Sequence, residues 1–168
     1  MPYHAGGTPM KRAEFAAAAI ATFALAGLSI RRSSAAQPYE VTHTDAQWRA
    51  LLGPDRYEIL RRGGTEPSFS SALIKETRAG IYRCAGCSLA LFSSKTKYDS
   101  GDGWPSFWDV LSNATQTQGD YALIEERTEV HCRRCGGHLG HIFDDGPPPT
   151  HLRYCIDGLA LRFVPGAA

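Results

Sequence analysis

The five cysteines are the residues of this 168-residue chain with the clearest capacity for chemistry. Four of them form two C-x-x-C pairs, Cys84/Cys87 and Cys132/Cys135, whereas Cys155 stands alone in a strand-like run. Two such pairs can present four thiolates to one tetrahedral Zn²⁺, which predicts a structural zinc site. A redox dithiol, an iron–sulfur centre and two disulfides need the same residue type and are the alternatives.

Histidines lie beside the second cysteine pair and shortly after it. His131 and His138 could each offer a nitrogen ligand, although four thiolates already complete a tetrahedron. His138 and His141 lie three residues apart in a glycine-rich segment, predicted to be a turn that the metal site holds rigid. Because histidine titrates near neutral pH, both are candidates to donate a proton in a reaction.

Cys155 lies in a segment, residues 152–157, that is predicted to be a strand. Period-two alternation puts Arg153, Cys155 and Asp157 on one face and the apolar Leu152, Tyr154 and Ile156 on the other. An arginine neighbour favours the thiolate, which is the nucleophilic form of cysteine. The alternative is that Cys155 is a small buried apolar residue, as many free cysteines are.

Composition indicates a soluble domain made of short strands and turns. Hydrophobic residues make up 43% and charged residues 21% of the chain, with 17 glycines and 10 prolines. Such frequent turn residues favour a β fold over a helix bundle. The net charge of +1 gives no basic footprint, which argues against a zinc-ribbon protein that binds nucleic acid.

Capping and periodicity predict short helices first and strands later. Thr44 and Gln47 form a capping box for a helix that ends at Gly53, and Pro54 begins a second short helix. Strands are predicted at residues 81–83, 89–92, 121–124, 127–131, 152–156 and 159–164. The prediction is a mainly β, zinc-bearing domain with short N-terminal helices.

The N-terminal segment has a different character. Basic residues 11–12 precede an apolar run at 15–30, and small residues at 34–36 resemble a cleavage site. This pattern predicts that residues 1–36 are a secretory signal peptide and that residues 37–168 form the exported, periplasmic domain. An uncleaved membrane anchor and a disordered extension of a cytoplasmic protein are the alternatives.

Four motifs occur in a fixed order along the chain. They are GTEP at 64–67, GIYRCAGCSLALFSSKTKYDSGDGWPSFW at 80–108, RTEVHCRRCGGHLGHIFDDGP at 127–147 and RYCID at 153–157. Together they resemble the B-type methionine sulfoxide reductases, which reduce the R epimer of methionine sulfoxide. The resemblance runs from Tyr39 to Pro165. It implies an antiparallel β barrel-like or two-sheet body, with residues 37–168 forming the reductase domain.

The resemblance also implies a role for each site residue. Cys155 would be the catalytic cysteine, and Trp104 would hold the S-methyl group of the substrate. His138 and His141 would polarise the sulfoxide oxygen or carry protons. The other implied positions are Asp157 beside the catalytic cysteine, Phe143 and Arg153 at the substrate, and Cys84, Cys87, Cys132 and Cys135 on one structural zinc ion.

The implied partners are small. Methionine sulfoxide, free or within proteins, would be the substrate of a monomeric enzyme without an organic cofactor. Thioredoxin or a similar thiol reductant would restore the enzyme through reduction of a cysteine sulfenic acid. A non-catalytic zinc module that binds a partner on the same fold is the rival hypothesis.

Two positions depart from the family pattern. Asp102 stands where many members have a resolving cysteine, so Cys155 has no intramolecular disulfide partner outside the predicted zinc site. Asp157 replaces the family asparagine beside Cys155. A charged Asp157 would raise the pKa of the thiol, whereas a protonated Asp157 could donate a hydrogen bond.

Overall fold

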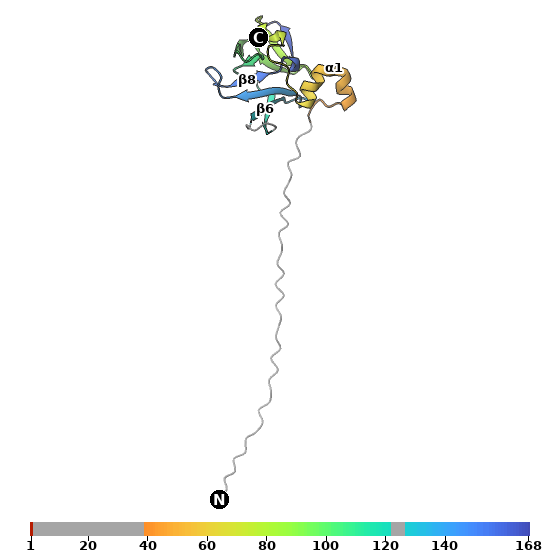
Figure 1. The fold of residues 1–168 in the computed structure, drawn as a ribbon, viewed down its shortest axis with the longest axis vertical. Helices are drawn as coiled ribbons and strands as arrows, with labels where there is room; N and C mark the ends of the chain where they lie inside the picture. The colour runs from red at the N-terminus through yellow and green to blue at the C-terminus, as the bar shows by residue number, and fades with distance from the viewer. Residues whose placement is uncertain (2–38, 122–126) are drawn as a thin grey trace. The chain divides into compact units, whose positions relative to one another are not determined.

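The computed structural model describes residue 1, residues 39–121 and residues 127–168. The chain divides into residues 1–36 and residues 37–168, and the second unit contains the described helices and strands (Figure 1). The predicted signal peptide lies outside the described residues and stays a prediction. Among the described helices, none is long and apolar enough to cross a lipid bilayer.

Two antiparallel sheets form the described domain (Figure 1). The smaller sheet has the strand order β2-β1-β9, and the larger has the order β3-β4-β8-β7-β6-β5. The strands are β1 (Gly80–Cys84), β2 (Ala90–Ser93), β3 (Lys97–Tyr98), β4 (Ser106–Phe107), β5 (Thr115–Asp120), β6 (Arg127–Cys132), β7 (His138–Phe143), β8 (Arg153–Ile156) and β9 (Leu161–Pro165). There are three short 3-10 helices among the described residues. Helix η1 (Ala72–Lys75) precedes β1, η2 (Ser94–Thr96) connects β2 to β3, and η3 (Gly158–Ala160) connects β8 to β9.

Three aromatic rings join the two sheets in the core. Tyr82 and Phe92 come from the smaller sheet, Phe107 comes from the larger, and all three side chains are fully buried. Phe92 and Phe107 stack with their ring centroids 4.4 Å apart, and Tyr82 meets Phe107 edge-on at 4.9 Å. This aromatic contact joins the two sheets through the core. The nine strands in two antiparallel sheets, with one long helix among the described residues, confirm the mainly β fold.

The two predicted helices are segments of a single element, α1 (Asp45–Arg62). The capping box between Thr44 and Gln47 is present, as predicted. Gly53 is not helical, with φ 71° and ψ 174°, and helical geometry resumes at Pro54. Gly53 therefore separates two helical segments, as predicted, since glycine adopts this backbone conformation without a steric penalty and proline suits a first helical turn.

Helix α1 supports the part of the larger sheet that carries the candidate site. It packs against β7 and η3, the elements that contain the two histidines and follow Cys155. Its buried side chains are Trp48, Leu52, Tyr57, Ile59 and Leu60. These contacts of α1 hold strand β7 and the turn after β8 in position.

Residues 138–143 form strand β7, where the sequence predicts a glycine-rich turn. Gly140 has φ 145°, and a Cβ atom there would lie 2.1 Å from the carbonyl oxygen of Cys155. The glycine therefore permits the close approach of β7 to β8 rather than a change of chain direction. In this register His141 lies directly opposite Cys155.

Two other strand boundaries differ from the prediction. Strand β5 ends at Asp120 and Tyr121 follows it outside any strand, whereas residues 122–124 of the strand predicted at 121–124 lie outside the described residues. The last strand begins at Leu161 because the turn η3 precedes it, whereas the sequence predicts a start at residue 159.

Glu66 fastens the loop after α1 to the turn after β8. Its side chain is 4% exposed and accepts hydrogen bonds from the backbone N–H groups of Gly158 and Leu159, the latter at 3.0 Å. Its own backbone N–H donates to Asp157 at 2.9 Å, and its carbonyl accepts from the indole of Trp104 at 3.1 Å. One buried residue thus positions both Trp104 and Asp157.

Replacing this fastening should destabilise the domain. Glu66→Ala leaves two backbone donors without an acceptor, so we expect the free energy of unfolding to fall by about 3 kcal/mol. Glu66→Gln keeps one acceptor oxygen and should cost about half as much. Urea denaturation of the metal-loaded protein measures both values, and a loss below about 0.5 kcal/mol for the alanine variant would contradict the assignment.

Candidate active site and metal centre

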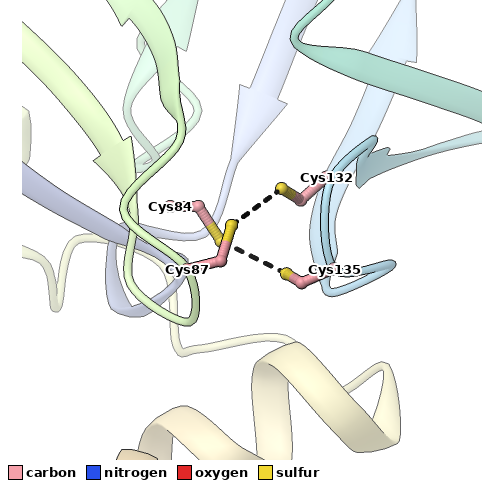
Figure 2. Close-up of side chains that lie close together, drawn as sticks. All are labelled: Cys84, Cys87, Cys132 and Cys135. Carbon is pink, nitrogen blue, oxygen red and sulfur yellow. Dashed lines mark hydrogen bonds between the residues drawn. The ribbon is translucent and has the colours of Figure 1, made fainter. Parts of the chain in front are cut away.

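Four cysteine side chains converge from one turn of each sheet (Figure 2). Cys84 ends β1 and Cys87 follows it, while Cys132 ends β6 and Cys135 follows it. The four Sγ atoms all lie within 4.8 Å of one another. The distance is 3.7 Å between Cys84 and Cys135 and 3.5 Å between Cys87 and Cys132.

This spacing suits a metal ion of the size of zinc. Four sulfur ligands about 2.3 Å from a tetrahedral Zn²⁺ lie about 3.8 Å from one another. A disulfide would need a sulfur–sulfur distance of about 2.05 Å, and all five cysteines are free. The cluster can therefore hold a metal ion, and the alternative of two disulfides is wrong. Among the described residues, no histidine joins the cluster.

Cys155 lies in the middle of the larger sheet. Strand β8 pairs with β4 on one side and β7 on the other, so Cys155 faces Ser106 and His141 across its two neighbours. The cysteine lines a small cavity of about 130 Å³. The other residues that line it are Thr65, Trp104, Arg127, Gly140, His141, Phe143 and Asp157. The cavity has the volume of about four water molecules, which fits a small functional group.

Burial controls the protonation of the Cys155 thiol. The apolar surroundings raise its pKa to about 11, and the charge of Arg153 only partly offsets this rise. The nearby carboxylates Asp102 and Asp157 raise the pKa further. The prediction that Arg153 favours the thiolate is thus correct in sign, but desolvation outweighs it, so the thiol is neutral at pH 7.

Trp104 and Phe143 form aromatic walls of the cavity. The indole N–H of Trp104 donates to the carbonyl of Glu66, which fixes the ring. Arg153 is not among the residues that line the cavity. Its guanidinium lies over the ring of Phe143, with its carbon 4.3 Å from the ring centroid. It also forms ion pairs with Asp145 at 2.7 Å and with Asp102.

Arg153 is therefore a support rather than a lining residue. Its ion pair with Asp102 connects the loop before Trp104 to strand β8, and its stacking holds Phe143. Asp102, at the position where the sequence lacks a resolving cysteine, makes a structural contact of its own. Cation–π and bidentate contacts of this kind restrict side-chain motion around a site.

Asp157 is buried on the wall of the cavity. Its side chain is 3% exposed, and one oxygen accepts the backbone N–H of Glu66 at 2.9 Å. Burial raises the pKa of Asp157 to about 7, and the hydrogen bond from Glu66 opposes this rise only partly. Near neutral pH a large fraction of Asp157 is thus a neutral carboxyl group that can donate a hydrogen bond.

His138 lies behind this wall and does not line the cavity, in contrast to the expected position. Its Nδ1 atom is 2.7 Å from the carboxylate of Glu129. Its Nε2 atom is 3.8 Å from Asp157, too far for a direct hydrogen bond, and is buried without a partner. His138 can therefore affect the cavity only through Asp157 or by motion.

His141 reaches the cavity and touches an acidic neighbour. Its Nε2 atom lies 2.8 Å from an oxygen of Asp120, and the same oxygen accepts from Arg127 at 2.6 Å. Burial lowers the pKa of His141 more than the hydrogen bond to Asp120 raises it. The ring is thus held neutral and oriented, 5.5 Å from the ring of His138.

Several residues of the site escaped the sequence analysis. Thr65 and Arg127 line the cavity, and Glu66 and Glu129 orient residues that line it or lie behind it. Thr65 and Glu66 lie in the GTEP motif at 64–67, where no local pattern marks a buried carboxylate. Arg127 and Glu129 alternate along β6, a pattern that fits an exposed strand face equally well.

Comparison with known proteins agrees with the motifs. The model of the SelR domain family matches residues 52–165. A protein of Leptospira interrogans named peptide methionine sulfoxide reductase MsrB is 52% identical over 126 residues, which cover 74% of this chain and 96% of that protein.

Proteins of the same name from two other bacteria are similar. The one from Thiobacillus denitrificans is 52% identical over 123 residues, covering 73% of this chain and 93% of its own length. The one from Agrobacterium fabrum is 49% identical over 127 residues, covering 75% and 94%. The chain therefore belongs to the SelR domain family of MsrB-type peptide methionine sulfoxide reductases, as its motifs predict.

Proposed function

We propose that this protein reduces the R epimer of methionine sulfoxide to methionine, with Cys155 as the nucleophile. The main support is that Cys155, the one thiol outside the four-cysteine cluster, lines a small cavity together with Trp104, His141 and Asp157. The names of its relatives support the same substrate class.

The cavity suits the end of an oxidised methionine side chain. Its volume of about 130 Å³ accommodates a methyl group, a sulfur and an oxygen but not a large ligand. The rings of Trp104 and Phe143 offer apolar contacts to the methyl group. Asp157 and His141 offer polar contacts to the sulfoxide oxygen. Three fixed directions at the substrate sulfur, toward the aromatic rings, the polar groups and Cys155, distinguish one epimer from the other.

The proposed reaction transfers an oxygen atom from the substrate to the enzyme. The Cys155 sulfur attacks the sulfoxide sulfur as the thiolate, and a proton is supplied to the departing oxygen. The oxygen ends on Cys155 as a sulfenic acid, and the methionine thioether leaves. The substrate sulfur gains two electrons and the cysteine sulfur loses two.

A thiol reductant then restores the enzyme. Two thiols of thioredoxin or a similar protein supply two electrons and become a disulfide, while the sulfenic oxygen leaves as water. The other four cysteines lie together in the metal-binding cluster, and Asp102 has no thiol. Cys155 therefore has no cysteine nearby with which to form a disulfide. We therefore propose direct reduction of a monomeric enzyme from outside.

A stereospecific assay tests the proposed activity. The full chain should reduce N-acetyl-methionine R-sulfoxide in the presence of dithiothreitol, and Cys155→Ser should abolish turnover because it removes the nucleophile. Cys87→Ser, measured with its metal content, separates loss of structure from loss of chemistry. Equal use of the S epimer would contradict the specificity, and no turnover with either epimer would favour a non-catalytic module.

The pH dependence of Asp157→Asn tests the state of the carboxyl group. Asparagine donates a hydrogen bond at every pH, whereas Asp157 donates only below its pKa of about 7. In single turnovers, the ratio of the rate constant of the variant to that of the wild type should be constant below about pH 6. It should then grow by up to about tenfold per pH unit above pH 7.

Two other outcomes would count against this role. A ratio that stays constant from pH 5 to pH 9 would show that the ionisation of Asp157 does not affect the reaction. A fall of the Asn variant to below about 1% of wild-type activity at pH 6 would show that Asp157 supplies a proton that an amide cannot.

Chemical trapping tests direct reduction. After one turnover without reductant, we expect a dimedone adduct at Cys155, since a sulfenic acid without a nearby thiol persists. The protein is denatured in the presence of a chelator and an alkylating agent, and its peptides are identified by mass spectrometry. A disulfide between Cys155 and any other cysteine of the chain would contradict the proposal. Cys155→Ser serves as the control without adduct.

Metal content tests the proposal that the cluster holds structural zinc. We expect one zinc ion per chain in the wild type and in Cys155→Ser, and almost none in Cys87→Ser. Loss of the ion should lower Tm by about 10 °C or more, because metal binding contributes to folding free energy. Elemental analysis and calorimetry measure the two effects. Iron in place of zinc, or full zinc content in Cys87→Ser, would refute the assignment.

A further inference from the structure

A second and larger cleft lies next to the Cys155 cavity. It has a volume of about 590 Å³, which is in the usual range for small-molecule sites. The two hollows are adjacent along two segments, because Thr65 and Asp157 line the cavity while their neighbours Glu66 and Gly158 line the cleft. The chemistry described above makes no use of this cleft.

Two arginines from different elements line the cleft, Arg56 from α1 and Arg162 from β9. Within the described part of the chain, neither guanidinium has a hydrogen-bond or ion-pair partner, and the Nη1 atom of Arg56 is buried. Burial and the charge of Arg162 both lower the pKa of Arg56. Two unpaired cations this close together are unfavourable, and an anion between them would relieve the repulsion.

Neighbouring charges do not supply that anion. Glu66 is the one carboxylate among the residues that line the cleft, and both of its oxygens accept backbone N–H groups of η3. Arg83 lies directly opposite Arg162 in the pairing of β1 with β9, which adds a third positive charge to this face. Like charges at paired positions are destabilising unless a counter-charge binds.

Apart from Ser70 and Ser71, the rest of the lining is apolar. The side chains of Leu73, Leu159, Leu161 and Phe163 contribute to it, beside the two arginines. A ligand that matches this surface has an apolar body and an oxyanion head, which guanidinium groups bind through two parallel hydrogen bonds. We propose that the cleft between α1, η1, η3 and β9 binds an organic carboxylate or phosphate with an apolar chain.

Titrations followed by NMR of the metal-loaded full chain test this site without any use of the proposed enzymatic activity. The probes are hexanoate, hexyl phosphate, hexanamide and inorganic phosphate. We expect saturable shifts of the amides of Leu159 and Arg162 with hexanoate or hexyl phosphate, and the tighter of the two identifies the head group. Hexanamide and inorganic phosphate should bind at least about tenfold more weakly, since each lacks one half of the ligand.

Variants locate the binding. Arg56→Gln and Arg162→Gln should each weaken the better probe about tenfold. Arg49→Gln is the matched control, because Arg49 lies on the same helix but pairs with Asp45 outside the cleft, and it should leave binding unchanged. Unchanged affinity in the Arg56/Arg162 double variant, equal binding of hexanamide, or no saturable shift with either anionic probe would overturn the proposal.

Discussion

The convergence of four thiols is the constraint on which the rest of the site depends. Cys84 and Cys87 belong to the turn between β1 and β2 of the smaller sheet, and Cys132 and Cys135 to the turn between β6 and β7 of the larger. An ion held by all four would fasten the two sheets at one point. Strand β7 starts three residues after Cys135, so the same point sets where His141 meets Cys155.

Desolvation, rather than charge, governs the chemistry of the cavity. Burial raises the pKa of both Cys155 and Asp157, and it lowers that of His141, so all three tend toward their neutral forms. Charged groups also surround these residues. Arg127 lines the cavity and is paired with Asp120, Arg153 lies over the ring of Phe143, and Glu129 contacts His138. The three groups that would face the sulfoxide are thus uncharged near pH 7, which suits a substrate that is itself uncharged.

Sequence reasoning was sufficient wherever one local rule decides the outcome. The spacing of the cysteines predicts the cluster, and the capping box predicts the start of α1. Period-two alternation puts Cys155 on the face of β8 away from the buried Tyr154. It failed where contacts between distant segments decide. Arg153 pairs with two carboxylates, His138 lies behind Asp157, and Glu66 has hydrogen-bond partners 91 to 93 residues away. No local pattern contains such information, because register and side-chain direction are set by tertiary packing.

The central claim is that four cysteines are held by a metal ion while Cys155 alone is available for reaction. Timed alkylation of the native, zinc-loaded protein, with each cysteine quantified by peptide mass spectrometry, tests it most directly. The account predicts that Cys155 is labelled first, at a rate that rises with pH toward its pKa of about 11, and that the other four react only after chelation. Labelling of any cluster cysteine as fast as Cys155 before chelation would contradict it.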